Sequence, residues 1–429
     1  MNPPSIAPSI VPNAVPGIAP HIAYVLLWFP LSSETFIFRE VQALRRRGLN
    51  VLAYSLYGEK LKNCSQEMID ASRDVRRMGI GAIPLILRDV RYWNKQKPGC
   101  VRALMREVLF RRWCNLEVTG ESVWAFFAGF RLARLLEHDH PAHIHAPWAG
   151  GPATAGWVAS RLTGIPFSLA GRAGDIYPPD GALAEKIRDS AFVRVNNRAN
   201  VEYLSSVAPA FASKVHLVYN SLTLKDDGQS SVTMAPPVKI LAVGRFARTK
   251  GFDVLLSAAR LLKDEGFPFT LTLVGAGFQG PKLTRLRKKL GLARDVAMPG
   301  FLPHDRLATL LNSHDMLVVP SVVHATGDRD GIPNVIMEAL SHRLPVVATD
   351  VCGITEVVRH GETGLISPQK DPAALARAIK AMASDRDRAV AMAEAGRDAV
   401  RTMFDPEANT KKLFDLFKSH LGTASEEAS

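Results

Sequence analysis

At 429 residues the chain is long enough for two domains with substantial cores, and its 47% hydrophobic and 22% charged residues exclude wholesale disorder. The formal net charge is +12, but residues 1–222 carry 26 basic against 17 acidic side chains while the remainder carries 27 against 24. No apolar run approaches the roughly 18 residues of a membrane span, and the N-terminus lacks the basic start of a signal peptide.

The chain begins with a proline repeat that is incompatible with regular structure. Prolines at positions 4, 8, 12, 16 and 20 fix φ and remove a backbone donor every four residues, so residues 1–20 are expected to form a disordered or polyproline-like tail. The four cysteines (Cys64, Cys100, Cys114 and Cys352) show neither a CxxC pair nor a metal-ligand spacing. We therefore expect a reduced, cytoplasmic protein.

Strands alternate with helices through the first half of the chain. Residues 21–30 and 50–57 read as strands, and an amphipathic helix between them can be capped by Ser32, Ser33 or Thr35. Further short strands are predicted at residues 143–148, 166–171, 192–197 and 216–220, with helices such as 153–162 between them. This alternation predicts a parallel sheet with helices on both faces, in a first domain over residues 21–222.

A basic segment, residues 73–112, interrupts this pattern. It holds 11 basic and 3 acidic residues, interleaved with aromatic and aliphatic side chains that include Tyr92, Trp93 and Phe110, and Trp113 directly follows it. Such a segment is typical of proteins that contact an anionic membrane surface or bind an acidic, lipid-linked substrate. A solvated basic face is the alternative; a nucleic-acid partner is not expected, because no nucleic-acid motif accompanies the segment.

A polar stretch that ends in two prolines, residues 223–237, is predicted to be a linker. The alternation then restarts in a second domain over residues 238–404, followed by a C-terminal helix (405–429) that is expected to cross back to the first domain. Its strands are predicted at residues 238–245, 269–275, 296–301, 316–321, 345–350 and 364–368. Two doubly wound α/β domains result, and ligands of such sheets bind at the carboxyl ends of the strands, here in a cleft between the domains.

Two carboxylates frame a strand-turn-helix unit in the second domain. After the strand at 316–321, Asp330 lies in the turn, and Glu338 lies on a helix predicted over residues 334–342, with Val335, Ala339 and Leu340 facing inward. The free amides of such a helix start suit a phosphate, and carboxylates on either side can grip sugar hydroxyls. From this stretch alone, an ordinary turn residue and a solvated helix residue remain the alternative.

A basic pair precedes this unit in the sequence. Gly244 and Arg245 end the strand at 238–245, and Lys250 opens the next helix. The planar guanidinium of Arg245 and the ammonium of Lys250 could together neutralise a diphosphate without a metal. Two solvated cations in a loop are the alternative. The run VGAGF at 274–278 is a glycine-rich strand exit and is weak evidence alone.

Together VGRFARTKG, VGAG and DGIPNVIMEA resemble the second domain of the family 4 retaining glycosyltransferases, whose GT-B fold has two Rossmann-like doubly wound domains facing a central cleft. The resemblance implies that Arg245 and Lys250 hold a donor diphosphate, Asp330 the sugar, and Glu338 the ribose. It also implies a donor-binding motif completed by Gly244, Gly331, Ile332, Pro333 and Asn334. The family usually has Glu where this chain has Asp330.

In the first domain, FPLSSETFIFRE and GPATAGWVASRLTGIPFS resemble a bacterial exopolysaccharide branch similar to the colanic acid and amylovoran glycosyltransferases. The resemblance implies acceptor-side residues Glu34, Thr35 and His145. It also implies a catalytic position at Arg172, where this branch has a histidine that faces the reacting sugar. An arginine stays protonated and cannot act as a base, but it can hold a phosphate or a sugar hydroxyl.

The resemblance implies a metal-independent retaining enzyme that transfers a hexose from a nucleoside diphosphate sugar to a lipid-linked or polysaccharide acceptor, at the cytoplasmic face of the inner membrane. No cofactor and no metal are expected. The histidines at 138, 140, 143 and 145 are candidate metal ligands, but no set of acidic or cysteine ligands accompanies them. A phosphorylase or nucleotide-sugar hydrolase on the same fold and a catalytically degenerate sugar-nucleotide-binding scaffold at the membrane remain alternatives.

Overall fold

The structure, a computed structural model, describes residues 21–32, 34–62, 64–108, 116–178, 182–221, 232–302 and 304–426. The predicted proline-rich tail, Ser33, most of the predicted linker, and Phe110 and Trp113 lie outside this range. The chain divides into two compact units. Unit 1 comprises described residues within Met1–Asn196, Asn200–Ser221 and Pro406–Ser429, and unit 2 those within Asn197–Ala199 and Leu222–Asp405.

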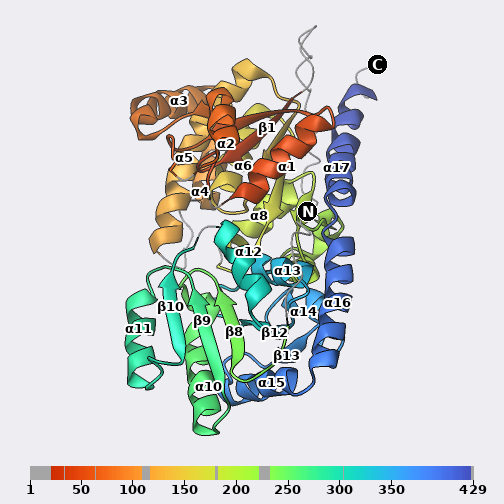
Figure 1. Cartoon of the computed structure of the whole chain (residues 1–429). Coiled ribbons are helices and arrows are strands. Elements are labelled where there is room, and N and C mark those ends of the chain that lie inside the picture. Colours follow the sequence, from red (N-terminus) through yellow and green to blue (C-terminus); the bar gives the residue numbers. More distant parts are fainter. Residues whose placement is uncertain are drawn as a thin grey trace. The chain divides into compact units, whose positions relative to one another are not determined.

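Unit 1 is built on a seven-stranded parallel sheet in the order β3-β2-β1-β4-β5-β6-β7 (Figure 1). The strands are β1 (His21–Leu26), β2 (Asn50–Ser55), β3 (Arg76–Arg77), β4 (His143–Ala146), β5 (Phe167–Gly171), β6 (Val193–Val195) and β7 (Val215–Leu217). Since β1 pairs with β2 on one side and β4 on the other, the strand order reverses there, and the carboxyl ends of β1 and β4 flank the switch point.

Helices cover both faces of this sheet. They are α1 (Thr35–Arg46), α2 (Gln66–Ala71), α3 (Ile83–Gln96), α4 (Pro98–Val108), α5 (Leu116–Asp139), α6 (Gly151–Thr163), α7 (Ala173–Ile176), α8 (Leu183–Asp189), α9 (Arg198–Val207) and α17 (Pro406–Glu426). Helix α6 packs against α5 and three strands, and α17 packs against α1 (Figure 1). Leu413 and Phe417 of α17 belong to the same buried cluster as Tyr24 of β1.

The predicted cap of α1 is not found among the described residues. The N-cap is Glu34, and no side chain of these residues caps the helix end, so neither Ser32 nor Thr35 has the predicted role; Ser33 lies outside the described residues. Glu34 instead accepts a hydrogen bond from the Trp148 indole N–H, at 3.3 Å, so its side chain is directed toward the end of β4.

Unit 2 holds a six-stranded parallel sheet in the order β10-β9-β8-β11-β12-β13. The strands are β8 (Val238–Val243), β9 (Phe269–Val274), β10 (Val296–Gly300), β11 (Met316–Val319), β12 (Val346–Thr349) and β13 (Leu365–Ser367). The strand order reverses between β8 and β11, so the loops that follow these two strands meet at the switch point.

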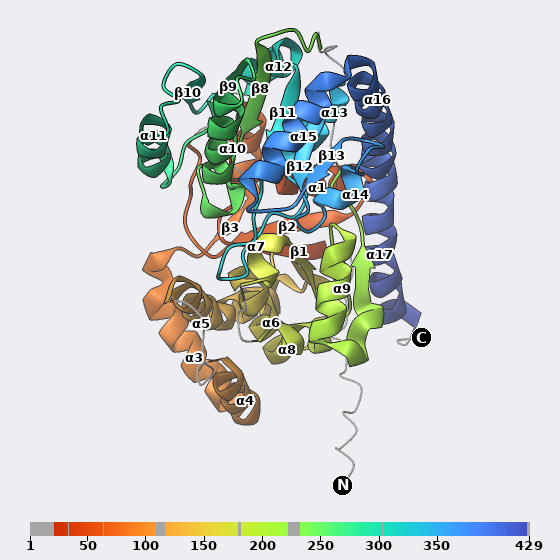
Figure 2. The same cartoon turned by 90° about the horizontal axis from the view of Figure 1, so that it is seen from below.

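The helices of unit 2 are α10 (Phe252–Asp264), α11 (Gly280–Lys289), α12 (His304–Ser313), α13 (Asn334–Ser341), α14 (Ile354–Val357), α15 (Pro372–Ser384) and α16 (Arg386–Met403). Helix α10 packs against α11 and α15 (Figures 1 and 2), and α13 packs against α16. The predicted inward stripes are confirmed, because Leu255, Ala258, Ala259 and Leu262 of α10 and Leu375, Ile379 and Met382 of α15 are buried.

Two parallel sheets flanked by helices confirm the predicted α/β fold class. Each of the twelve strands predicted from the sequence is present, and β3 is added within the basic segment. Within the described ranges, no helix combines the length and the apolar character needed to cross a bilayer. The cysteines in those ranges, Cys64, Cys100 and Cys352, are free thiols.

Candidate functional site

A close backbone contact at a glycine joins the loop after β8 to the loop after β11, at the switch point of unit 2. Gly251, the N-cap of α10, has φ +61°, and a Cβ at this position would lie 1.9 Å from the carbonyl oxygen of Pro320. The Val322 amide donates to the Thr249 carbonyl oxygen at 2.8 Å, which fixes the same approach. Only glycine allows the loop after β8 to lie this close to the loop after β11.

Because the two loops lie this close together, a cation from one contacts a carboxylate from the other. Lys250 Nζ lies 2.9 Å from Asp330 Oδ1, and the two side chains are only 16% and 14% exposed. The Ser321 hydroxyl donates to the other oxygen, Asp330 Oδ2. Two residues predicted to hold different parts of a donor, its diphosphate and its sugar, therefore lie in direct contact.

A second carboxylate and an arginine lie beside this pair. Burial raises the pKa of Asp328, and the neighbouring charge of Asp330 raises it further, whereas the guanidinium of Arg245 opposes the shift. Arg245 itself is exposed just after β8, and a Cβ at the neighbouring Gly244 would lie 3.4 Å from the Lys250 side chain. The site thus offers an exposed planar fork and a half-buried ammonium, both suited to phosphate oxygens.

Helix α13 supplies the remaining predicted donor-binding residues. Gly331 and Ile332 are half-buried, Pro333 is the extended N-cap residue, and the exposed Asn334 begins the helix. Its first amides have no partner within the helix and can bind an anion. Glu338 is half-buried one turn further on.

The predicted inward face of α13 needs a correction. Val335 is only half-buried, and Ile336 and Met337 are buried together with Ala339 and Leu340. The buried stripe is therefore rotated toward Ile336, because the helix packs against both the sheet and α16.

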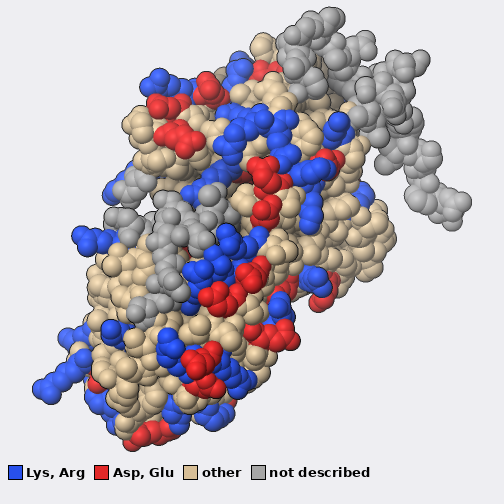
Figure 3. Space-filling model, turned by 45° about the vertical axis from the view of Figure 1, so that its right-hand side comes forward, with Lys and Arg blue, Asp and Glu red and all other residues tan. Residues whose placement is uncertain are grey.

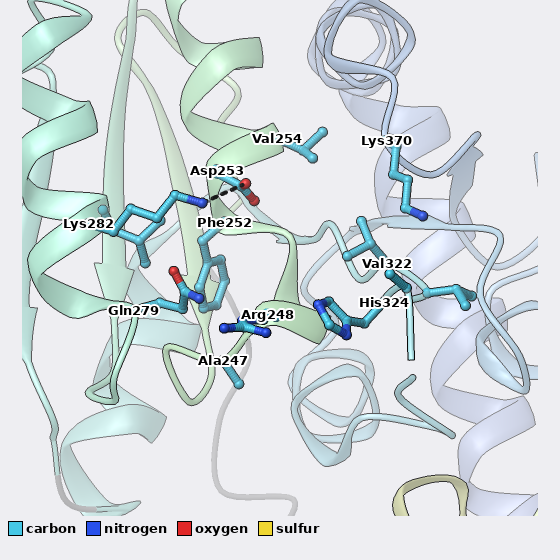
Figure 4. A pocket seen from close by; sticks show the side chains of 13 residues that line it. Ala247, Arg248, Phe252, Asp253, Val254, Gln279, Lys282, Val322, His324 and Lys370 are labelled. Atoms are coloured by element: carbon cyan, nitrogen blue, oxygen red, sulfur yellow. Dashed lines mark ion pairs between the residues drawn. The ribbon is translucent and has the colours of Figure 1, made fainter. Parts of the chain in front are cut away.

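A cavity of about 610 Å³ opens among the same loops (Figure 4). It is lined by the loops after β8 and β11 and by the first turns of α10 and α11, with Arg248 and His324 facing each other across it. Lys282 and Lys370 add positive charge, and Asp253 lies 3.9 Å from the Lys282 ammonium. Its lining does not include Lys250, Asp330 or Glu338, so the cavity adjoins the predicted donor site without containing it.

At the switch point of unit 1, Glu34 and Trp148 meet between the ends of β1 and β4. Burial raises the pKa of the Glu34 carboxyl, and the Trp148 hydrogen bond and the charge of Arg172 oppose the shift. Thr35, the neighbouring predicted residue, is exposed in the first turn of α1. A half-buried carboxylate beside an indole and an exposed hydroxyl can bind the hydroxyl groups of a sugar.

Arg172 follows β5 and is 6% exposed. Its guanidinium donates to Asn220 Oδ1 at 2.9 Å and to the Pro147 carbonyl oxygen at 3.3 Å, and it lies 4.4 Å from the centre of the Phe36 ring. Burial lowers the pKa of Arg172 to about 10, so the group stays protonated at neutral pH. Contacts with Asn220, Pro147 and Phe36 therefore fix the position of the guanidinium.

One Arg172 nitrogen, Nη2, has no hydrogen-bond partner among the described residues and lies 4.0 Å from Glu40 Oε2. The same Glu40 oxygen pairs with Arg194. Glu40 and Ser321 were not among the predicted site residues. Glu40 lies inside the FPLSSETFIFRE motif, and Ser321 ends the predicted strand that precedes Asp330. These positions in the sequence could have identified both residues as site candidates.

His145 does not lie where an acceptor could reach it. It is fully buried, its Nδ1 is 2.8 Å from Ser168 Oγ, and its ring packs against Tyr24 and Phe417. Burial lowers its pKa well below the ordinary value. The strand prediction was right, and this residue of β4 points into the core, so its burial does not support the acceptor-side role predicted for it.

His143 shares this environment, with Nε2 2.7 Å from the same Ser168 hydroxyl. His138, by contrast, is exposed beside Asp139. Within the described residues, no group of three or more His, Cys, Asp or Glu side chains is arranged to hold a metal ion.

Comparison with known proteins bears on the site of unit 2. Residues 228–399 match the family described as glycosyl transferases group 1. The colanic acid biosynthesis glycosyltransferase WcaL of Escherichia coli is 33% identical over 186 residues, 43% of this chain and 46% of that protein. The amylovoran biosynthesis glycosyltransferase AmsK of Erwinia amylovora is 31% identical over 182 residues, 42% and 45% of the two chains. The matched segments thus span a little under half of each relative, and they confirm the predicted resemblance.

Solved structures are similar over nearly the whole chain. A sucrose-phosphate synthase from Thermosynechococcus elongatus has a TM-score of 0.70 at 20% identity, over 94% of this chain and 100% of that one. HepE of Anabaena, solved with UDP and glucose, has a TM-score of 0.67 at 16% identity, over 94% and 100%. At these identities the likeness establishes the GT-B type of fold alone.

Proposed function

We propose that this chain, which carries a group 1 glycosyltransferase domain over residues 228–399, is a metal-independent retaining glycosyltransferase of exopolysaccharide synthesis. It transfers a hexose from a nucleoside diphosphate sugar to a hydroxyl of a lipid-linked or polysaccharide acceptor, at the cytoplasmic face of the inner membrane. The observation that carries the proposal is the Lys250–Asp330 pair, which lies at the switch point of the unit 2 sheet beside the start of α13.

On the donor side, Arg245 and Lys250 would neutralise the diphosphate. As the bond between the sugar and the diphosphate breaks, negative charge grows on the leaving phosphate oxygens, and the two cations with the first amides of α13 would stabilise it. Asp330 and Glu338 would accept hydrogen bonds from the sugar and the ribose. The complex of HepE with UDP and glucose supports a donor of this chemical class.

On the acceptor side, the proposal rests on Glu34 and Thr35 at the switch point of unit 1. The carboxylate of Glu34 would accept a hydrogen bond from an acceptor hydroxyl. Arg172 would act as a positioning residue, because it is buried and donates hydrogen bonds to Pro147 and Asn220.

The experiment that tests the donor assignment is thermal unfolding with UDP, GDP and ADP sugars, each with and without EDTA. A shift of several degrees with one nucleotide class, unchanged by EDTA, is the expected result. The preferred donor is then used in transfer assays with Lys250→Ala and Glu338→Ala. Undiminished transfer by either variant would contradict the site assignment. Binding without turnover would favour the scaffold alternative, and breakdown of donor without an acceptor sugar would favour a hydrolase or phosphorylase.

A further inference from the structure

Exposed large aliphatic side chains gather in one short segment of unit 1. Ile80, Ile83, Leu85 and Leu87 are 67%, 44%, 37% and 53% exposed, and they belong to the turn Ile80–Ala82 and the first turns of α3. Among the described residues, only Phe278 and Phe301 of unit 2 are other large hydrophobic side chains exposed to this degree. A gathering of this kind marks an interaction surface more often than chance exposure does.

The orientation of α3 is fixed from the other side. Ile86, Asp89 and Trp93 form its buried stripe, and the Asp89 carboxylate accepts a hydrogen bond from Arg131 of α5 at 3.1 Å. A rotation of α3 that buried Ile83 and Leu87 would break this pair and expose Trp93 to water, so the observed orientation is favoured. The exposure of Ile83 and Leu87 therefore follows from the way α3 packs in unit 1.

The exposed aliphatic side chains continue into a row of cations. Ile83, Leu87, Arg91 and Lys95 are spaced by four residues and so lie along one face of α3. Arg91 and Lys95 are exposed, and neither makes an ion pair within the part of the chain that the structure describes. Arg88 is also exposed, and its Nε lies 3.6 Å from the Asp89 carboxylate. Arg102 and Arg106 of α4 are also exposed.

This face differs from a surface of mixed charge. On the face drawn in Figure 3, Lys and Arg side chains gather in patches that Asp and Glu side chains interrupt. In contrast, the one acidic residue of α3, Asp89, is buried. Both surfaces are rich in Lys and Arg. The face of α3 differs because it combines exposed aliphatic side chains with cations, Arg91 and Lys95, that make no ion pair among the described residues.

The structure also changes which residues of the basic segment could contact a bilayer. Trp93, one of the aromatic residues expected to contact the membrane, is 3% exposed. The Tyr92 ring is covered by the Arg134 guanidinium, 3.9 Å from the ring centre. The aliphatic side chains at 80–87, which the sequence analysis did not single out, take their place.

We propose that the surface formed by Ile80, Ile83, Leu85, Leu87, Arg88, Arg91 and Lys95, named here the α3 tip, docks on an anionic phospholipid surface. The aliphatic side chains enter the boundary between headgroups and acyl chains, and the cations contact lipid phosphates. Charge complementarity favours this occupant over a second copy of the chain, since two α3 tips would bring like charges together.

The test is flotation of the full-length chain with vesicles of phosphatidylcholine, alone or mixed with phosphatidylglycerol. We expect binding to the mixed vesicles only, weakened by salt. Binding is measured without donor or acceptor, so its outcome is independent of any transferase activity.

Two variants separate the contributions. Ile80→Ser/Ile83→Ser/Leu87→Ser should lower the partition coefficient at least about tenfold, because three aliphatic side chains no longer leave water. Arg88→Gln/Arg91→Gln/Lys95→Gln should lower it by a factor of about five for each cation and abolish the salt dependence. The matched control is Phe278→Ser/Phe301→Ser, which removes exposed hydrophobic side chains from unit 2 and should leave binding unchanged.

The changed side chains are exposed, so all three variants should unfold at the wild-type temperature. The proposal is overturned if the wild type does not float with anionic vesicles, if the serine variant floats as well as the wild type, or if the control loses binding equally. It is also overturned if the wild type is a dimer that the serine variant converts to a monomer, because a second copy then covers the surface.

Discussion

Asp330 and a donor diphosphate should compete for Lys250. In the structure the ammonium is 2.9 Å from the Asp330 carboxylate, so a phosphate oxygen that binds it must replace or share that partner. Asp330→Asn keeps the shape of the side chain and removes its charge. We therefore expect this variant to bind a free nucleoside diphosphate more tightly than the wild type, although it should transfer sugar more slowly.

The magnitude follows from the geometry. A phosphate held by Lys250 would lie roughly 5 Å from the carboxylate, where two unit charges at an effective dielectric constant of about 20 repel by about 3 kcal/mol. Solvent and the serine hydroxyl screen part of this, so we expect a gain of about 1.4 kcal/mol, or about tenfold in Kd. The variant itself should lose about 1–3 kcal/mol of stability, between the values for exposed and buried pairs.

Calorimetric titration with UDP, GDP and ADP, at one ionic strength, measures the effect without involving the sugar. The control is Asp253→Asn, which makes the same change in net charge within unit 2, at a residue 3.9 Å from Lys282. The double variant Lys250→Ala/Asp330→Asn should show no gain over Lys250→Ala. The competition is refuted if Asp330→Asn binds no nucleoside diphosphate more tightly, or if the gain persists without Lys250.

Three further results are expected. Glu338→Ala should bind UDP and 2′,3′-dideoxy UDP equally, whereas the wild type should prefer the ribose form about tenfold in calorimetry; a preference that survives would exclude the ribose role. Gly251→Ala should destabilise unit 2 by at least about 3 kcal/mol in thermal unfolding, because its Cβ would lie 1.9 Å from a carbonyl oxygen, while Gly266→Ala, at φ +71° with nothing within 4 Å, should cost about 1 kcal/mol. Burial lowers the pKa of His143 to about 3, so the unfolded chain binds a proton that the folded chain does not, and stability should fall as the pH drops below about 6.5, by up to about 1.4 kcal/mol per pH unit. His143→Gln should flatten this dependence and His138→Gln should not; equal slopes in both variants would contradict the assignment.

The strands and the helix of the candidate donor site could be predicted because their signals are local. A short β-branched run such as Met316–Val319, followed by a polar loop and a helix, is typical of a buried parallel strand. The contact between Lys250 and Asp330 could not be predicted from spacing, because it joins residues 80 positions apart and depends on the φ of Gly251. Sequence similarity to a family supplied the roles, and the fold supplied the contact.

The basic segment shows the opposite case. Its residues offer two candidate apolar faces for α3, one with Trp93 and one with Ile83 and Leu87, and single-sequence periodicity does not choose between them. The choice is made by Arg131 of α5, 42 residues beyond the aspartate that it binds. Likewise, His145 is on a predicted strand, but its inward direction follows from partners such as Ser168 and Phe417 that are distant in sequence.

Helix α17 has a consequence for the order in which the protein is made. Phe417 packs against Tyr24, His143 and Phe192, so the core of unit 1 includes a residue synthesised after all of unit 2. Domains generally fold as they emerge from the ribosome, N-terminal first. Here the first sheet can assemble early, but its apolar cluster closes last, and until the final helix leaves the ribosome the nascent chain carries an incomplete core that chaperones can recognise.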